Sequence, residues 1–203
     1  MTPIIIDDFL PEIYIDSIYK LMGGDQIPWS FSKYSVDSDP DGLEKLYHTD
    51  EPVKEHIQFR HIFIDENKVK SAHLQYIAPL IACYEKEMGK IKYTQRIKSN
   101  LLMPQEGVKL QRPHVDDNDI TSYDSTGYIG NKKTLLYYVN NSDGDTILYN
   151  EKYEGKPVGL VTKQQSITPV KGRAVIFDSN QIHSGHIPTD KKYRLVINCV
   201  FEH

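Results

Sequence analysis

Apolar positions along this chain follow two different periods, and the change between them falls near Gly89. Before that glycine, apolar residues recur every three to four positions, which is the spacing of one helical face. The pattern predicts a helix over about 11–22, ended by the Gly-Gly pair that follows, and a second helix over about 65–88. Pro79 is expected to kink or divide the second helix. The apolar residues assigned to that helix are Val69, Ala72, Tyr76, Ile77, Leu80, Ile81 and Tyr84.

Two further N-terminal segments lack the helical period. Residues 3–9 predict a short strand, and the polar stretch 25–50, with its prolines and glycine, predicts a long loop. Loops of this length in compact domains are often functional, so the aromatic residues within it, led by Trp29, are candidate binding residues.

After Gly89 the apolar residues alternate with polar ones in short runs separated by turn residues, which is typical of strands. Helices followed by short strands predict an α+β fold whose β part is a jelly roll. We expect one domain over residues 1–203, with helical support from about 1–90 and the jelly-roll core at about 91–203. The predicted strands cover 93–103, 108–116, 134–139, 146–150, 159–162, 166–169, 173–177 and 192–201.

Composition narrows the function classes. A chain of 203 residues, 39% of them hydrophobic, can bury one substantial core. Its 24 basic and 28 acidic residues include no long basic run, so nucleic acid is not a favoured partner. No stretch approaches the roughly 20 apolar residues of a membrane span. The two cysteines lie in apolar surroundings, which favours free thiols and a cytoplasmic location; the sequence does not indicate an oligomeric state.

A metal-ligating pattern stands out in the β half. His114 and Asp116 are two positions apart, so on a strand both side chains point to the same face. His183 follows a later apolar run and is the preferred third ligand, with His186 as its rival. Two imidazoles and one carboxylate are the ligand set that holds a ferrous ion with coordination positions left open. The alternative without a metal site is that the acidic run beginning at Asp116 is a solvated turn.

Arg194 supplies a second signal, because it begins the last apolar run of the chain. On that strand Arg194, Val196 and Asn198 share one face by alternation. A guanidinium on a buried strand needs an anionic partner, so we expect Arg194 to bind a carboxylate.

Taken together, these residues resemble the non-haem iron, 2-oxoglutarate-dependent dioxygenases, in particular the prolyl 4-hydroxylase-like branch. The resemblance extends over about 3–201. Its pieces are Ile-Ile-Asp-Asp-Phe-Leu at 5–10, His-Val-Asp at 114–116, Thr-Leu-Leu-Tyr-Tyr-Val-Asn at 134–140, Asp-Gly-Asp-Thr at 143–146, Pro-Val-Lys-Gly-Arg-Ala-Val-Ile-Phe at 169–177, and His-Ser-Gly at 183–185 with Arg194. The chain departs from the family at Leu-Met-Pro, 102–104, where relatives often have a tyrosine before Pro-Gly, and at Gly144-Asp145, where Gly-Gly is usual.

The resemblance implies a double-stranded β-helix and an enzyme that uses Fe(II), 2-oxoglutarate and O2. Such an enzyme hydroxylates a C–H bond of a prolyl, peptidyl or small-molecule substrate and releases succinate and CO2. The alternative is a cupin-like metal-binding jelly roll that does not use 2-oxoglutarate. Both are compatible with His114, Asp116 and His183 as metal ligands.

The resemblance also assigns pocket residues. Arg194 and Tyr138 would bind the distal carboxylate of 2-oxoglutarate, although Tyr138 also suits a core position. Thr134 and Leu136 share the strand face of Tyr138 and are expected to line the same pocket. Candidate substrate residues are Arg112, Tyr123, Tyr128, Trp29 and Asn198. For Arg112 a surface ion pair, and for the two tyrosines loop packing, are the alternatives.

Overall fold

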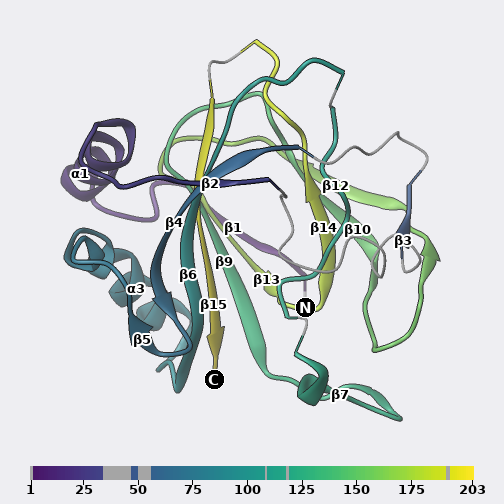
Figure 1. Ribbon diagram of the computed structural model, residues 1–203. Coiled ribbons are helices and arrows are strands. Elements are labelled where there is room, and N and C mark those ends of the chain that lie inside the picture. Colours follow the sequence, from purple (N-terminus) through teal and green to yellow (C-terminus); the bar gives the residue numbers. More distant parts are fainter. Residues whose placement is uncertain (1, 34–46, 50–55, 108, 118, 191–192) are drawn as a thin grey trace.

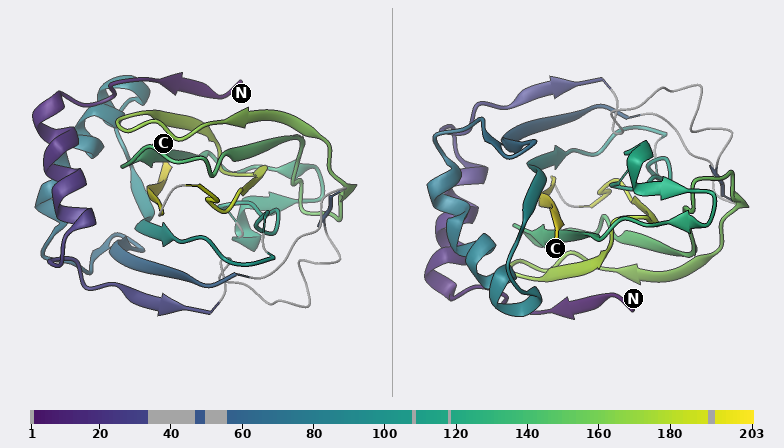
Figure 2. Two further views of the ribbon diagram at one scale, coloured as in Figure 1. Left: turned by 90° about the horizontal axis from the view of Figure 1, so that it is seen from above. Right: turned by 90° about the horizontal axis from the view of Figure 1, so that it is seen from below.

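The structure is a computed structural model in which helices cover one face of a large sheet and a smaller sheet faces the other side (Figures 1 and 2). It describes residues 2–33, 47–49, 56–107, 109–117, 119–190 and 193–203. Helix plus antiparallel sheet confirms the predicted α+β class.

The large sheet has eight strands, in the order β1-β13-β9-β15-β6-β4-β2, with β5 paired to β4. All of its paired strands run antiparallel. The strands are β1 (Ile4–Ile6), β2 (Ser30–Ser32), β4 (Gln58–Asp65), β5 (Lys68–Val69), β6 (Tyr93–Leu102), β9 (Lys132–Tyr138), β13 (Ala174–Asp178) and β15 (Arg194–Glu202).

The smaller sheet has the order β12-β10-β14 and completes the jelly roll. Its strands are β10 (Thr146–Lys152), β12 (Lys163–Ile167) and β14 (Gln181–Gly185). Two short ribbons accompany it. They pair β3 (Tyr47–His48) with β11 (Gly159–Leu160), and β7 (Tyr123–Asp124) with β8 (Gly127–Tyr128), the latter preceded by a 3-10 turn at Ile120–Ser122.

Two helices, α1 (Glu12–Gly23) and α3 (Leu74–Met88), cover the outer face of the large sheet. Each presents one apolar stripe, as the spacing of its apolar residues predicts. The core between helices and sheet contains Ile15, Ile18, Leu21, Met22, Ile77, Leu80, Tyr84, Phe63, Ile97, Leu135, Tyr137, Ile176, Ile197, Cys199 and Phe201.

Strand alternation divides the large sheet into an apolar face and a functional face. On β15, Leu195, Ile197 and Cys199 belong to the helix-side core. Arg194, Val196 and Asn198 point the other way and line a pocket between the two sheets. The predicted shared face of these three residues is therefore correct, because β15 is a regular strand paired on both sides.

The N-terminal part contains more strand than the sequence pattern predicted. Residues 58–65 form β4, and the second helix begins at Leu74 instead of about residue 65. Glu66 and Asn67 both have positive φ (47° and 59°) and make the tight turn to β5, where Val69 is exposed. Pro79 does not divide α3, which continues through it to Met88. The predicted loop over 25–50 contains β2 and β3, and its residues 34–46 and 50 lie outside the described residues.

The C-terminal part differs from the prediction at two places. Residues 109–117 form no regular strand and are held by isolated bridges, Leu110 to His186 and His114 to His183. His183 itself lies on β14, which was not among the predicted strands, because the polar residues Asp-Ser-Asn-Gln that precede it are typical of a turn. The strand forms because it pairs with β10, a contact between distant parts of the chain that the local sequence does not predict.

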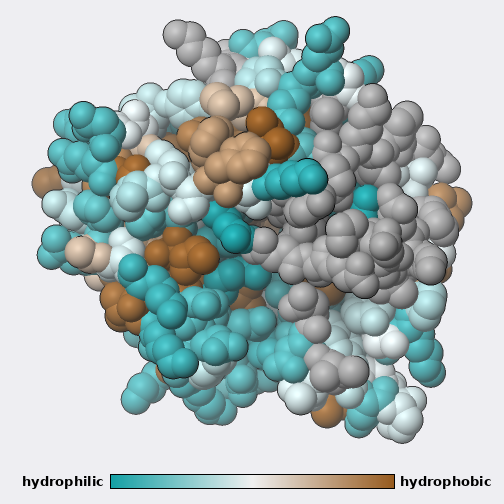
Figure 3. Space-filling model, in the orientation of Figure 1, coloured by the Kyte–Doolittle hydropathy of each residue, from teal (hydrophilic) through white to brown (hydrophobic). Residues whose placement is uncertain are grey.

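The surface is mixed in character. The face in Figure 3 shows small brown apolar groups separated by hydrophilic side chains. Exposed large apolar residues include Ile13, Phe31, Val69 and Ile129. Among the described residues, no helix combines the length and the apolar character that a membrane crossing requires.

The helix-side core generates a stability prediction. Leu80 of α3 is fully buried against the sheet, so Leu80→Ala should lower the free energy of unfolding by about 2–5 kcal/mol. Val69 is 62% exposed, so Val69→Ala should change it by less than about 0.5 kcal/mol. Urea denaturation of both variants measures the difference; equal effects would contradict this packing.

Candidate functional site

Three predicted ligands come together where the segment 109–117 meets β14. Backbone hydrogen bonds of 2.9 Å run in both directions between His114 and His183. One ligand atom from each of His114, Asp116 and His183 lies within 4.8 Å of the others. His183 Nε2 is 3.5 Å from Asp116 Oδ2. His186, the rival ligand, is not part of this group.

The two histidines are oriented as metal ligands require. His114 Nδ1 donates to the Arg112 carbonyl at 3.0 Å, and His183 Nδ1 donates to the Gln181 carbonyl at 2.9 Å. With both Nδ1 atoms protonated, each Nε2 keeps a lone pair for a metal. Burial, aided by the neighbouring His183, lowers the pKa of His114 to about 3, so its ligating neutral form is favoured. This donor set fits a divalent iron ion.

The Asp116 carboxylate is 4% exposed and is held from three strands of the large sheet. Thr134 donates to its Oδ2 at 2.9 Å, Asn198 donates to the same atom at 3.0 Å, and Arg96 donates to Oδ1 at 3.0 Å. Burial by itself would raise the pKa of Asp116, but the electrostatic influence of the neighbouring His183 ring and Arg96 guanidinium outweighs it and holds this pKa well below its usual range. The ligand therefore stays ionised.

Two of these three contacts alter the sequence interpretation. Thr134 was expected to line the cosubstrate pocket, and Asn198 to touch substrate. Asn198 lines the pocket, Thr134 is not among the residues that line it, and both side chains hold Asp116. Sequence reasoning missed Arg96. The available signal was a cation within a run that alternates like a buried strand.

Arg194 lies at one end of the pocket and is 4% exposed. Its Nη2 donates to Thr146 Oγ1 at 2.8 Å, and Tyr138 donates to the same oxygen at 2.7 Å. Its Nε is buried without a hydrogen-bond partner. A buried cation with an unused donor fits a carboxylate ligand, and 2-oxoglutarate supplies one. The pocket is lined by Asn100, Gln111, His114, Leu136, Thr146, His183, Ser184, Gly185, Arg194, Val196 and Asn198.

Gln111 and His56 add a polar contact at the Arg194 end that the sequence did not indicate. The Gln111 amide donates to His56 Nε2 at 2.7 Å, and His56 is 2% exposed. Burial, together with the charge of Arg194, lowers the pKa of His56 to about 4. Parity had favoured Arg112 for the pocket, but Gln111 lines it because this segment is not a regular strand.

The remaining predicted substrate residues lie elsewhere. Arg112 is half-buried and does not line the pocket. Tyr123 donates to the Asp117 carbonyl at 2.5 Å, and Tyr128 donates to Asp117 Oδ2 at 3.0 Å, with the two rings 5.2 Å apart. This arrangement matches the loop-packing alternative. Trp29 packs against the helix-side core, on the opposite face of the large sheet.

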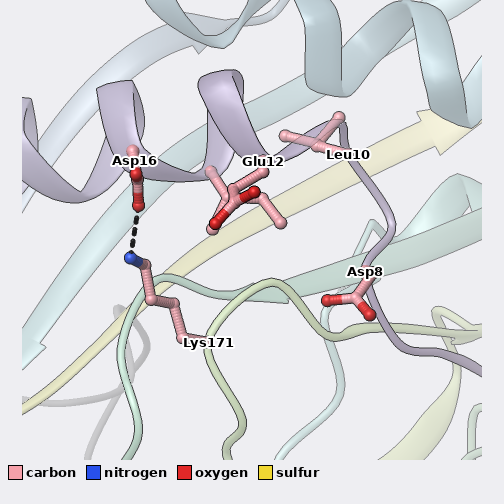
Figure 4. Close-up of a pocket in the computed structure, with 6 residues that line it drawn as sticks. Asp8, Leu10, Glu12, Asp16 and Lys171 are labelled. Carbon is pink, nitrogen blue, oxygen red and sulfur yellow. Dashed lines mark hydrogen bonds and ion pairs between the residues drawn. The ribbon is translucent and has the colours of Figure 1, made fainter.

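A separate cavity of about 410 Å³ lies beside α1 (Figure 4). It is lined by Asp8, Leu10, Glu12, Ile15, Asp16 and Lys171, and the Lys171 ammonium pairs with Asp16 at 2.6 Å. None of the three metal-ligand candidates or Arg194 borders it. The metal-ligand candidates and Arg194 therefore belong to the site between the two sheets and not to this cavity.

A family model described as the 2OG-Fe(II) oxygenase superfamily matches residues 102–202, about half of the chain. The matched range includes the three metal-ligand candidates, His114, Asp116 and His183, and Arg194. The chain belongs to this superfamily. No curated protein matches the sequence.

Solved structures share the fold at low sequence identity. An oxidoreductase of the 2OG-Fe(II) oxygenase family from Burkholderia pseudomallei has a TM-score of 0.63 at 10% identity, covering 98% of this chain and 84% of that one. A Trichoplax adhaerens prolyl hydroxylase, in complex with a peptide fragment of the hypoxia inducible factor oxygen degradation domain, has a TM-score of 0.59 at 16% identity, covering 98% and 83%. The epimerase SnoN, in complex with Fe3+, alpha ketoglutarate and nogalamycin RO, has a TM-score of 0.59 at 11% identity, covering 98% and 78%. The fold of this superfamily member is thus the predicted double-stranded β-helix.

His56 generates a pH prediction for the metal-free enzyme. Its folded-state pKa of about 4 lies below the unfolded value near 6.5, so the unfolded chain binds more protons and stability falls as the pH drops through this window. Between pH 7 and pH 5, this histidine should lower the free energy of unfolding by roughly 2 kcal/mol. Unfolding free energies measured from pH 7 to 5 should therefore decline less steeply in His56→Gln. Parallel slopes in the two proteins would rule out this contribution.

Proposed function

We propose that this oxygenase hydroxylates a C–H bond of a peptide or small-molecule substrate while converting 2-oxoglutarate to succinate and CO2. One observation carries the proposal. His114 and His183, which form one ligand group with Asp116, border the same pocket as the buried Arg194 with its unpartnered Nε. The metal set would bind iron, and Arg194 would bind the carboxylate at the far end of the cosubstrate.

When bound, iron and 2-oxoglutarate supply the oxidising chemistry with O2. The protein's own residues hold and orient them. His114, Asp116 and His183 would hold the iron, while Thr134 and Asn198 keep the Asp116 carboxylate in place. Ligation by Asp116 would leave no place for a halide ligand, which favours hydroxylation over halogenation.

Arg194 and the apolar wall orient the cosubstrate. The Thr146 hydroxyl accepts hydrogen bonds from both Arg194 and Tyr138, which fixes the direction of the guanidinium. Leu136 and Val196 line the pocket with apolar surface, which excludes water and strengthens the interaction of Arg194 with a carboxylate. The family assignment disfavours the cupin-like alternative, in which this arginine would have no carboxylate to bind.

The similar structures support both substrate classes. The Trichoplax enzyme is in complex with a peptide, and SnoN is in complex with nogalamycin RO. We further propose one domain over 1–203, because β1, β2 and β4 from the N-terminal part join the same sheet as the C-terminal strands. A cytoplasmic location is proposed from the two free cysteines.

The metal assignment is tested with two histidine variants. His183→Ala removes one of the three ligands and should abolish iron-dependent succinate formation. His186→Ala is the matched control, three positions along the chain and outside the ligand group, and should largely preserve activity. Fe(II) binding measured on both variants separates metal loss from misfolding. Loss in His186→Ala with retention in His183→Ala would reassign the ligand.

The cosubstrate assignment is tested by anaerobic titration of the Fe(II) protein with 2-oxoglutarate, followed by the visible absorption of the chelate. Arg194→Ala should weaken 2-oxoglutarate binding by roughly 30-fold or more, because it removes a buried charge partner. Arg173→Ala removes an arginine that pairs with Asp7 on the surface and should leave this affinity unchanged. An unaltered affinity in Arg194→Ala would refute its role.

A further inference from the structure

The amide of Gln111 lies beside Arg194, at the end of the pocket that would take a carboxylate. Gln111 is 8% exposed, and its backbone N–H donates to the Gly185 carbonyl at 2.8 Å. A Cβ placed on Gly185 would be 2.4 Å from Gln111 Oε1 and 3.5 Å from Arg194 Nη1. Because this glycine has no side chain, the amide and the guanidinium lie side by side over it, and all three residues line the pocket.

His56 contacts the other side of the same amide. Gln111 Nε2 is 2.7 Å from His56 Nε2, and an amide nitrogen only donates, so the ring proton is on Nδ1. The pKa of His56 is about 4, so the ring is neutral near pH 7 and carries one proton. The Gln105 side chain bonds the Ile57 backbone in both directions, at 3.1 and 2.8 Å, which anchors the chain next to His56. The ring therefore meets Gln111 from a defined position.

Nothing in the described part of the chain fixes the tautomer of His56. The Nδ1 atoms of His114 and His183 donate to backbone carbonyls, which holds their protons in place. His56 Nδ1, in contrast, is buried and has no hydrogen-bond partner. A proton on Nδ1 leaves a buried donor unpaired, and a proton on Nε2 leaves a buried acceptor unpaired, so the two tautomers differ little in this respect. The atom that Gln111 presents to the ring decides between them.

The amide of Gln111 can pair with His56 in two orientations. In the structure Nε2 faces the ring, and Oε1 lies beside Arg194. Half a turn of the amide exchanges these two atoms within nearly the same volume, because the last torsion of glutamine is broad. Oε1 then accepts from a proton on His56 Nε2, and the amide N–H groups face Arg194 and the pocket. Either orientation keeps one hydrogen bond to the ring.

A carboxylate held by Arg194 would favour the second orientation. Without a ligand, the partial negative charge of Gln111 Oε1 suits the buried guanidinium beside it. A carboxylate has only acceptor atoms, so it disfavours Oε1 as a neighbour and favours the amide N–H. Arg194 has little freedom to adjust, because its Nη2 is bonded to Thr146 and its Cδ is 3.0 Å from the Cβ position of Gly144. Gln111 is therefore the group that can change.

We propose that Gln111 is a second binding residue for the distal carboxylate of 2-oxoglutarate, and that His56 is the positioning residue that supports its donor orientation. When the cosubstrate binds, the amide of Gln111 turns and donates to the carboxylate beside Arg194. The neutral His56 ring releases the Nδ1 proton to solvent and takes one up at Nε2, so it donates to Gln111 Oε1 and its charge does not change. This inference rests on the proposed oxygenase function and adds two residues to its cosubstrate site.

The change of tautomer is a direct test, because a packing role does not require it. Nitrogen-15 NMR of histidine-labelled, Zn(II)-substituted protein distinguishes a ring proton on Nδ1 from one on Nε2, and the signal missing from His56→Gln identifies His56. Saturating 2-oxoglutarate should move the His56 proton from Nδ1 to Nε2 in the wild type but not in Gln111→Leu. Pyruvate has the keto-acid end of the cosubstrate without its second carboxylate, so it should leave the proton on Nδ1.

Affinities connect this change to the two side chains. Gln111→Leu removes the donor at similar volume and should weaken anaerobic 2-oxoglutarate binding to the Fe(II) protein about 10- to 100-fold, with pyruvate and Fe(II) affinities changed less than about threefold. His56→Phe keeps a ring without hydrogen bonds and should weaken 2-oxoglutarate binding about 3- to 10-fold. His56→Gln keeps a donor and an acceptor and should recover most of that loss. Gln165→Leu, the same change at an exposed position of β12, is the matched control and should alter none of these values.

Several outcomes overturn the proposal. A His56 proton on the same nitrogen with and without 2-oxoglutarate, or one that moves equally with pyruvate, excludes the change of tautomer. Unchanged 2-oxoglutarate affinity in Gln111→Leu excludes the second binding residue. Equal losses in His56→Phe and His56→Gln would show that the ring only packs. Wild-type protein that binds neither Fe(II) nor 2-oxoglutarate would instead refute the oxygenase function itself.

Discussion

The arrangement of the two sheets around the site depends on keeping one buried carboxylate ionised. Asp116 is almost fully buried, and an unsupported charge there would be costly. Thr134 of β9, Asn198 of β15 and Arg96 of β6 each donate one hydrogen bond to it. Three neighbouring strands of the large sheet therefore converge on a segment that belongs to the opposite side of the sandwich. The metal ligand and the joining of the two sides depend on the same atoms.

The strict alternation of the central strands makes this convergence compatible with a stable core. Leu135, Tyr137 and Ile197 pack under the helices, while the residues between them face the pocket. Polar chemistry and hydrophobic burial thus occupy opposite faces of the same strands. The sheet can carry the buried Arg194 and the partly buried Arg96 because each is directed to a hydrogen-bond partner, Thr146 for Arg194 and Asp116 for Arg96.

The positive charges are also arranged along the sheet in a definite order. Arg194 lies at one end of the pocket, the ligands follow, and Arg96 lies beyond them. The loop tyrosines Tyr123 and Tyr128 stabilise the chain after Asp116 by bonding to Asp117.

The sequence by itself determined the fold class, the helix α1, most C-terminal strands, the grouping of His114, Asp116 and His183, and the direction of Arg194. These follow from periods of about 3.6 and 2 and from residues whose chemistry is unusual in an apolar run. Only the tertiary structure decided that 109–117 is an irregular segment held by bridges, that His183 lies on β14, and that Arg96, Gln111 and His56 reach the site. The physical reason is that pairing across the sheets supplies hydrogen bonds and contacts between residues far apart in the chain, which no local period records.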